Sequence, residues 1–341
     1  MFKIEKIFRY PVKSMGGDDM QTTFLSENGI PGDRCWTLKD EVRGGIKGGK
    51  RFPQLMGMHA RLETEPTREL ISPDVVIKIK DGIEVKSNDP EVNSVLSAHI
   101  DSPVSLWPLL PKEMLDHYKR GALPEGLSPM RHLRELFART EDESLPDLSV
   151  FPKELATYES PPGTYFDAYP LLIMTRASLR TFSALDDERK FDVRRFRPNI
   201  LLETEEKGFP EEKLVGQRGR LGSAILKFEI ICPRCVMTTH GFNDLPKDPK
   251  IMRSLVKHNN GNLGVYASVE TPGNISLGGS TLYNVVARLT TPRRDVSKGH
   301  SFVHPWLLRE AKNSLGYYIR HYFVCSSRNS QTRRAHVRHL N

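Results

Sequence analysis

Cysteine is scarce in this sequence. Four cysteines in 341 residues are too few for the disulfide framework that stabilises small secreted domains. No apolar run approaches the roughly 20 residues that cross a bilayer as a helix, so we expect no transmembrane segment. Residues 2–8 alternate apolar and charged side chains, which is typical of a strand rather than of a signal peptide. These features predict a protein of a reducing compartment, by default the cytoplasm.

A net excess of positive or negative charge is also missing from most of the chain. The net charge is +8, but residues 287–341 contain eleven Lys and Arg against two acids, so the remainder sums to −1. A near-neutral body argues against nucleic acid as a partner of the main fold. The basic tail, 291–341, has no assigned role. It could contact nucleic acid or an anionic membrane, or it could lack a specific partner.

Turn-forming residues, in contrast, are common. The 24 prolines and 25 glycines often stand at segment boundaries, which favours a strand-rich fold over a helical bundle. We predict a β-dominated α+β fold with a smaller N-terminal β-rich domain (1–107), a Pro-rich insertion with a short helix (108–164), a second domain (165–290) and the tail. Strands are expected at residues 2–10, 33–38, 75–80, 82–86, 104–107, 165–175, 200–203, 224–231, 263–269 and 283–289, and helices at 90–99, 130–140 and 176–185, the last with Thr175 as N-cap.

One motif indicates chemistry, the segment from Cys232 to Cys235, which directly follows an expected buried strand. Arg234 lies beside the second thiol and favours its thiolate, which is both a nucleophile and a metal ligand. The segment could be half of a zinc site, a redox dithiol, a pair of buried small hydrophobes or a single functional thiol. A zinc site lacks its second pair of ligands, and residues 236–240 do not predict the helix of a thioredoxin-type dithiol. We take the single functional thiol as the working hypothesis.

An arginine cluster, Arg194 to Asn199, precedes the expected strand at 200–203. Such a run is usually a solvated charged surface. Here, however, apolar residues interleave the arginines, and Arg197 and Asn199 flank a proline at the mouth of the strand. Guanidinium groups in that position suit a phosphate or a carboxylate.

Three weaker signals lie near the N-terminus. Lys13 and Ser14, in a Gly-rich turn, either bind an anion or form an ordinary turn. Arg34 is expected to be buried and needs a partner, either the neighbouring aspartate or a ligand anion. Residues 44–50 match the GxxxxGK phosphate loop, but Arg51 replaces the Ser or Thr and no helix follows. We therefore predict a hairpin loop with a basic tip that binds no nucleotide.

In this order the motifs resemble the MOSC family, the domain shared with the C-terminus of molybdenum-cofactor sulfurases. They are most similar to its subgroup that includes the mitochondrial amidoxime reducing component. The resemblance runs from residue 2 to about 289 through YPVKS (10–14), GDRCW (32–36), TRASL (175–179), RFRPNI (195–200) and CPRCVMTT (232–239). It implies a β-barrel MOSC domain preceded by a smaller MOSC N-terminal β-domain, with a pterin-bound molybdenum cofactor (molybdopterin) between them.

The resemblance also implies roles for individual residues. Cys235 would be the catalytic residue and the thiolate ligand of molybdenum, a soft ligand of the kind that such metals accept. The residues implied to hold the pterin and its phosphate are Lys13, Ser14, Arg34, Thr175, Ser178, Arg195, Arg197, Asn199 and Arg234.

The implied activity is the reduction of N-hydroxylated or related small substrates. Electrons would come from separate donor proteins, because the sequence contains no ferredoxin domain. The pyridoxal-phosphate desulfurase domain of the fused sulfurases is missing too, so pyridoxal phosphate is linked to this chain by family only. The alternative is a sulfur carrier or transferase that holds a Cys235 persulfide for metal–sulfur cofactor maturation. A third hypothesis is a non-catalytic binding module that uses the basic tail.

Overall fold

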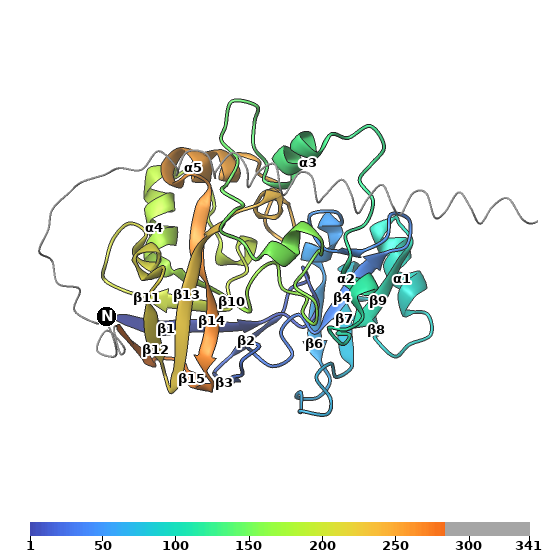
Figure 1. The fold of residues 1–341 in the computed structure, drawn as a ribbon, viewed down its shortest axis with the longest axis horizontal. Coiled ribbons are helices and arrows are strands. Elements are labelled where there is room, and N and C mark those ends of the chain that lie inside the picture. The colour runs from blue at the N-terminus through green and yellow to red at the C-terminus, as the bar shows by residue number, and fades with distance from the viewer. Residues whose placement is uncertain (284–341) are drawn as a thin grey trace, which may run out of the picture.

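The computed structural model describes residues 1–283, in which β-strands outnumber α-helices (Figure 1). The α-helices are α1 (Val92–Ile100), α2 (Leu115–Tyr118), α3 (Pro129–Leu136), α4 (Arg176–Leu185) and α5 (Lys250–Asn259). The strands are β1 (Phe2–Arg9), β2 (Asp18–Met20), β3 (Thr22–Leu25), β4 (Trp36–Asp40), β5 (Ile46–Lys47), β6 (His59–Leu62), β7 (Val75–Lys78), β8 (Glu84–Lys86), β9 (Val104–Pro108), β10 (Leu171–Thr175), β11 (Ile200–Glu203), β12 (Arg218–Leu221), β13 (Ala224–Pro233), β14 (Asn262–Thr271), β15 (Gly273–Ser276) and β16 (Ser280–Tyr283). The predicted β-dominated α+β class is confirmed.

The largest sheet closes on itself. Its strands follow the order β11-β10-β14-β13-β12-β16-β1-β2, and β1 pairs again with β11. In that pairing Ile4 lies opposite Leu202 and Ile7 opposite Ile200, which joins the ends of the sheet into a barrel. The first strand of the chain is therefore part of the same barrel as strands some 200 positions later. This pairing brings the turn after β1 to one end of the barrel, the end that holds the candidate site described below.

Alternating side chains fill the barrel. In β13, Ala224, Leu226 and Phe228 are buried while the residues between them are less so, which is the period-two pattern of a strand with one face in a core. Helices α4 and α5 cover the outside of the barrel (Figure 1) and bury Phe182 and Leu255 in a second cluster. The barrel therefore has a core on both surfaces of this part of its wall, which makes it a rigid support for residues at its end.

A smaller β-rich part lies beside the barrel (Figure 1). It contains the sheets β5-β4-β9 and β6-β7-β8 together with α1, and its own core includes Val12, Met15, Trp36 and Leu96. The chain between β9 and β10 forms α2, α3 and long loops. The domain boundaries expected from the sequence, 1–107, 108–164 and 165–290, stay predictions.

Several elements confirm the sequence expectations. Helix α4 covers the expected residues, and the Thr175 side chain caps it by accepting a hydrogen bond from the Ser178 amide. The strand expected at 165–175 begins only at Leu171, and α5 was not predicted. Tyr283 ends β16, whereas the rest of the strand expected at 283–289 and the tail 291–341 lie outside the described residues. Among residues 1–283, no helix combines the length and the apolar character needed to cross a membrane.

Candidate functional site

A narrow cavity has walls from both parts of the molecule. Lys13 and Arg34 come from the smaller part, and Arg197, Arg234 and Cys235 come from the barrel. We call it the inner cavity; its volume is about 120 Å³. The barrel supplies its residues at strand ends, just before β11 and just after β13. Side chains at these positions are free of the sheet's packing and can point to a ligand.

The structure brings together most of the residues that the sequence singled out. Eight of them line the inner cavity: Lys13, Ser14, Arg34, Arg195, Arg197, Asn199, Arg234 and Cys235. Thr175 and Ser178 do not. Both are fully buried, and their hydroxyls donate to Oε2 of Glu211 at 2.7 Å and 2.5 Å. The TRASL motif therefore forms a helix cap and a buried polar cluster, not a wall of this cavity.

Three cavity residues have an uncommon backbone conformation. Ser14, Arg34 and Arg197 have φ angles of 71°, 47° and 55°, in the left-handed region that non-glycine residues seldom adopt. They are three of the seven non-glycine residues with positive φ among residues 1–283. Such conformations cost free energy and tend to cluster where a ligand is held. The sequence gives no sign of them, because none of the three is Gly or Asn.

Asp33 and Asn199 join the two walls. Asp33 accepts hydrogen bonds from Arg34 Nη1 and from Asn199 Nδ2, the latter at 2.9 Å. Arg34 Nη1 also donates to Asn199 Oδ1 at 3.1 Å. Arg34 thus has the neighbouring aspartate as its partner, the simpler of the two expected alternatives. Asn199, fixed also by the Leu172 amide, orients Arg34 rather than pointing freely into the cavity.

Arg197 is a buried cation of the site whose donors are only partly satisfied. Its Nη1 donates to the Met15 carbonyl, but its buried Nη2 has no hydrogen-bond partner among the described residues. Its guanidinium lies against the ring of Tyr10, 4.2 Å from the centroid. Burial lowers the pKa of Arg197 to about 10, and the nearby charge of Arg34 adds to this effect. A buried donor without an acceptor is costly, so this atom marks a place for an anionic ligand.

The two cysteines of the CPRC motif differ in environment. Cys232 is 1% exposed, and burial raises the pKa of its thiol. Arg234 Nη1 donates to Cys232 Sγ at 3.1 Å, and its Nη2 donates to the Phe196 carbonyl at 2.6 Å. Cys235 is partly exposed and lines the cavity. The sequence left several interpretations of this motif open. The geometry favours one in which one thiol is buried and the other is accessible.

The other arginines of the cluster point elsewhere. Arg194 is at the surface, where it pairs with Asp192 and Asp244. Arg195 is 1% exposed and donates to the carbonyls of His240 and Pro246 at 2.9 Å and 2.8 Å. Arg195 therefore fixes the chain after Cys235, which begins with a short 3₁₀ turn, η6 (Val236–Thr239). Within the cluster, Arg197 is the residue placed to bind a ligand.

Two charged residues of the cavity were not predicted as site residues. Asp167 accepts from Lys13 Nζ at 3.0 Å. Burial would raise the pKa of Asp167, but Lys13, Lys50 and Arg34 outweigh it and hold that pKa well below its usual range. Burial lowers the pKa of Lys13 despite this pairing. Lys50 belongs to the rejected phosphate-loop motif, and its appearance here could not be read from its sequence context.

The inner cavity adjoins a wider one, of about 400 Å³, which we call the outer cavity. Lys13, Ser14, Lys50, Asp167 and Met237 line both. The inner cavity alone is below the roughly 300–1,000 Å³ usual for ligand pockets, and the two together reach that range. The hairpin loop expected at 44–50 is only partly right, because the β4–β5 hairpin turns at 41–45 and residues 46–47 are strand β5. A second turn follows at 48–51 and lines the outer cavity together with the hairpin.

Comparisons with known proteins identify two domains along the chain. The MOSC N-terminal beta barrel domain matches residues 1–102, and the MOSC domain matches residues 162–281. No curated protein matches the chain at a significant level. Similar solved structures include the YuaD protein from Bacillus subtilis, with 12% identity over 82% of this chain and 94% of that one and a TM-score of 0.36. Another is YiiM from Geobacillus stearothermophilus, with 18% identity over 34% of this chain and 54% of that one and a TM-score of 0.26.

Proposed function

The chain belongs to the MOSC family, which is associated with molybdenum-cofactor binding, and we propose that it holds this cofactor with Cys235 as the protein ligand of the metal. On this proposal it is an oxidoreductase that reduces N-hydroxylated or related small molecules, as its resemblance to the amidoxime reducing component suggests. Its electrons come from a separate donor protein.

One observation carries the proposal: an accessible thiol and an unpaired buried guanidinium nitrogen line the same cavity. Cys235 offers a soft sulfur ligand, the type that molybdenum accepts. Arg197 Nη2 lacks an acceptor, which a phosphate oxygen can supply. These residues fit a metal cofactor that carries a phosphate.

The remaining cavity residues have distinct tasks on this proposal. Lys13, Ser14, Arg34 and Arg234 would hold the pterin and its phosphate together with Arg197. Asn199 and Arg195 are positioning residues, the first for Arg34 and the second for the chain that follows Cys235. Thr175 and Ser178 support α4 at a distance from the cavity. The cofactor would thus be held by cations from both family domains.

The bound cofactor supplies two electrons for each substrate molecule. Reduction of an amidoxime to an amidine consumes these two electrons and two protons. The N–O bond breaks, an N–H bond forms, and the oxygen leaves as water. The protein's own contribution is to orient the substrate against the metal and to shape the charge around it.

The test is purification from cells that make the cofactor, followed by metal analysis and an assay with benzamidoxime and a reduced dye. We expect stoichiometric molybdenum and the formation of benzamidine. Metal-free protein whose Cys235 carries the mass of one additional sulfur atom would instead support the sulfur carrier. Protein that contains neither molybdenum nor this adduct would contradict both functions.

A further inference from the structure

The outer cavity is strongly basic. Six cationic side chains line it against three carboxylates, an excess of three positive charges with His132 neutral. The cations are Lys13, Arg43, Lys47, Lys50, Arg51 and Arg120, and the carboxylates are those of Glu135, Glu159 and Asp167. A recessed surface with an excess of one sign of charge concentrates ligands of the opposite sign.

Several of these charges neutralise one another. Glu159 forms ion pairs with Lys47 and, at 2.9 Å, with Arg120. Burial would raise the pKa of Glu159, but these two cations outweigh it and lower that pKa to about 2. Arg51 pairs with Asp40 at 3.3 Å. These groups build the wall and are not free to bind a ligand individually.

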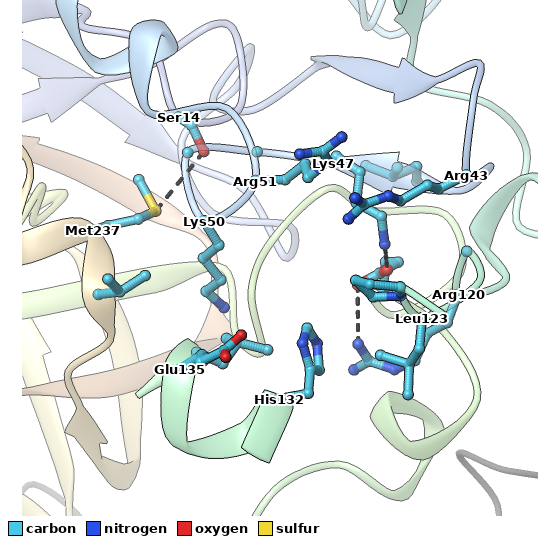
Figure 2. Close-up of a pocket in the computed structure, with 18 of the residues that line it drawn as sticks. Ser14, Arg43, Lys47, Lys50, Arg51, Arg120, Leu123, His132, Glu135 and Met237 are labelled. Carbon is cyan, nitrogen blue, oxygen red and sulfur yellow. Dashed lines mark hydrogen bonds and ion pairs between the residues drawn. The ribbon is translucent and has the colours of Figure 1, made fainter. Parts of the chain in front are cut away.

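Lys50, in contrast, is available. Figure 2 shows it extending into the outer cavity from the turn at 48–51, with Ser14 and Met237 beside this turn and His132 and Glu135 of α3 across the cavity. Its ammonium group forms no hydrogen bond or ion pair with any residue of the described part of the chain. Lys50 is exposed. Desolvation within the cavity would lower its pKa, but the charges of Asp167 and Cys235 outweigh this effect and raise that pKa. Lys50 is therefore a charged donor that faces the space next to the thiol.

Glycines hold the β4–β5 hairpin and the turn at 48–51 against the site. A Cβ atom at Gly49 would lie 2.8 Å from Met237 Cε, and one at Gly48 would clash with the Ser14 hydroxyl. At Gly45, where φ is +75°, a Cβ would lie 2.5 Å from the Gly121 amide nitrogen. Gly45, Gly48 and Gly49 of the apparent phosphate loop thus serve close packing. They fix the position of Lys50 between the inner and the outer cavity.

We propose that the outer cavity binds an anionic substituent of the substrate and that Lys50 is the residue that selects it. The enzyme would then prefer N-hydroxylated molecules that carry a carboxylate, with the N–O group directed to Cys235 and the carboxylate to Lys50. This inference rests on the proposed function, because it places the reacting end of the substrate at the cofactor. The inner arginines serve the cofactor phosphate, and Lys50 serves the substrate.

The experiment compares benzamidoxime with 4-carboxybenzamidoxime as substrates of the molybdenum-loaded full-length protein. The wild type should show a higher kcat/KM for the carboxylated compound. Lys50→Gln should lower the ratio of the two kcat/KM values by about tenfold, as expected for the loss of one charge-assisted contact. Lys50→Arg should keep the ratio, and the control Lys78→Gln, at an exposed position of β7, should leave it unchanged.

Calorimetry without reductant gives a second readout. Lys50→Gln should weaken binding of 4-carboxybenzamidoxime by about tenfold more than binding of benzamidoxime, at unchanged molybdenum content. Arg43→Gln, a second variant of the cavity, should lower the preference in the same direction. An unchanged preference in both variants would overturn the inference.

Two further outcomes separate this inference from the proposed function. Loss of molybdenum from Lys50→Gln would make Lys50 a cofactor residue, which overturns the substrate role and leaves the proposed function intact. Wild-type protein without molybdenum would refute the proposed function. In that case, calorimetry would still show whether the cavity selects anions, because it compares the binding of the carboxylated and the uncharged compound directly.

Discussion

The guanidinium carbon of Arg197 lies 4.2 Å from the centre of the Tyr10 ring. Arg34 contacts the same ring, at 4.9 Å, so one aromatic side chain contacts two cations that come from different halves of the sequence. Cation–π contacts stabilise such groups by about 0.5–2 kcal/mol each, which is less than the cost of burying an unpaired charge. The arrangement is therefore suited to binding an anion rather than to stabilising the protein in the absence of a ligand.

Arg197→Met separates these two effects. The variant should lose most of its molybdenum, because the unpaired donor is gone. The free energy of unfolding of the metal-free protein should change by less than about 1 kcal/mol or increase, since a buried charge is removed. Metal analysis and urea unfolding measure the two quantities. Arg194→Gln, in the surface pair three positions earlier, should retain the metal, and full molybdenum in Arg197→Met would contradict the assignment.

Thr175→Ala tests the structural role of the TRASL motif. The variant loses the α4 cap and one hydrogen bond to Glu211, so its free energy of unfolding should fall by about 1–2 kcal/mol. Molybdenum per folded chain should not change. Thermal or urea unfolding, with metal analysis of the same samples, checks both statements. Ser183→Ala, on the exposed side of α4, is the control and should stay within about 0.5 kcal/mol of the wild type.

Much of the fold and part of the site follow from local sequence. The cap at Thr175, α4 and the strands β7 and β8 were predicted because their signals lie within a few residues of one another. Helix α5 carries a signal that was missed: Ile251, Met252 and Leu255 have helical spacing, and Asn260 follows as a left-handed C-cap.

The rest of the site depends on contacts across the chain. Tyr10 contacts two arginines, and Asp167 pairs with Lys13, yet each partner is more than 20 positions away. The roles of Thr175 and Ser178 could not be decided from sequence, because a hydroxyl that caps a helix and one that binds a phosphate look the same there. The availability of Lys50 depends on which carboxylates the other cations occupy, which only the structure shows.

Gly49→Ala tests the packing of the turn at 48–51 on the thiol segment. The added methyl would displace the flexible end of the Met237 side chain, so we expect either a stability loss of about 1 kcal/mol or a shift of the turn that lowers substrate turnover severalfold. Unfolding and steady-state kinetics distinguish the two. At Gly57 an added Cβ meets no atom within 4 Å, so Gly57→Ala is the matched control. A variant at Gly49 that equals this control in both measurements would show that the loop does not need to approach so closely.

The low pKa of Glu159 predicts that the stability of the protein depends on pH. Its pKa in the folded protein is about 2, below that of an unfolded chain, so its contribution is present above about pH 4.5 and is lost as the pH falls towards 2. The stability difference between the wild type and Glu159→Gln should therefore shrink by up to about 3 kcal/mol between about pH 5 and pH 2. Urea unfolding at several pH values measures it. Glu154→Gln, at an exposed carboxylate, should follow the wild type, and a constant difference for Glu159→Gln would show that the carboxylate gains nothing from its partners.

The most direct test of the account is the molybdenum content of Cys235→Ser beside that of Cys35→Ser, each purified from cells that make the cofactor. Cys35 is buried in the core of the smaller part and lines neither cavity, so its replacement removes a thiol from outside the proposed site. The account predicts that Cys35→Ser retains molybdenum and that Cys235→Ser loses it while remaining folded. Equal molybdenum in the two variants would contradict the assignment of Cys235 as the ligand.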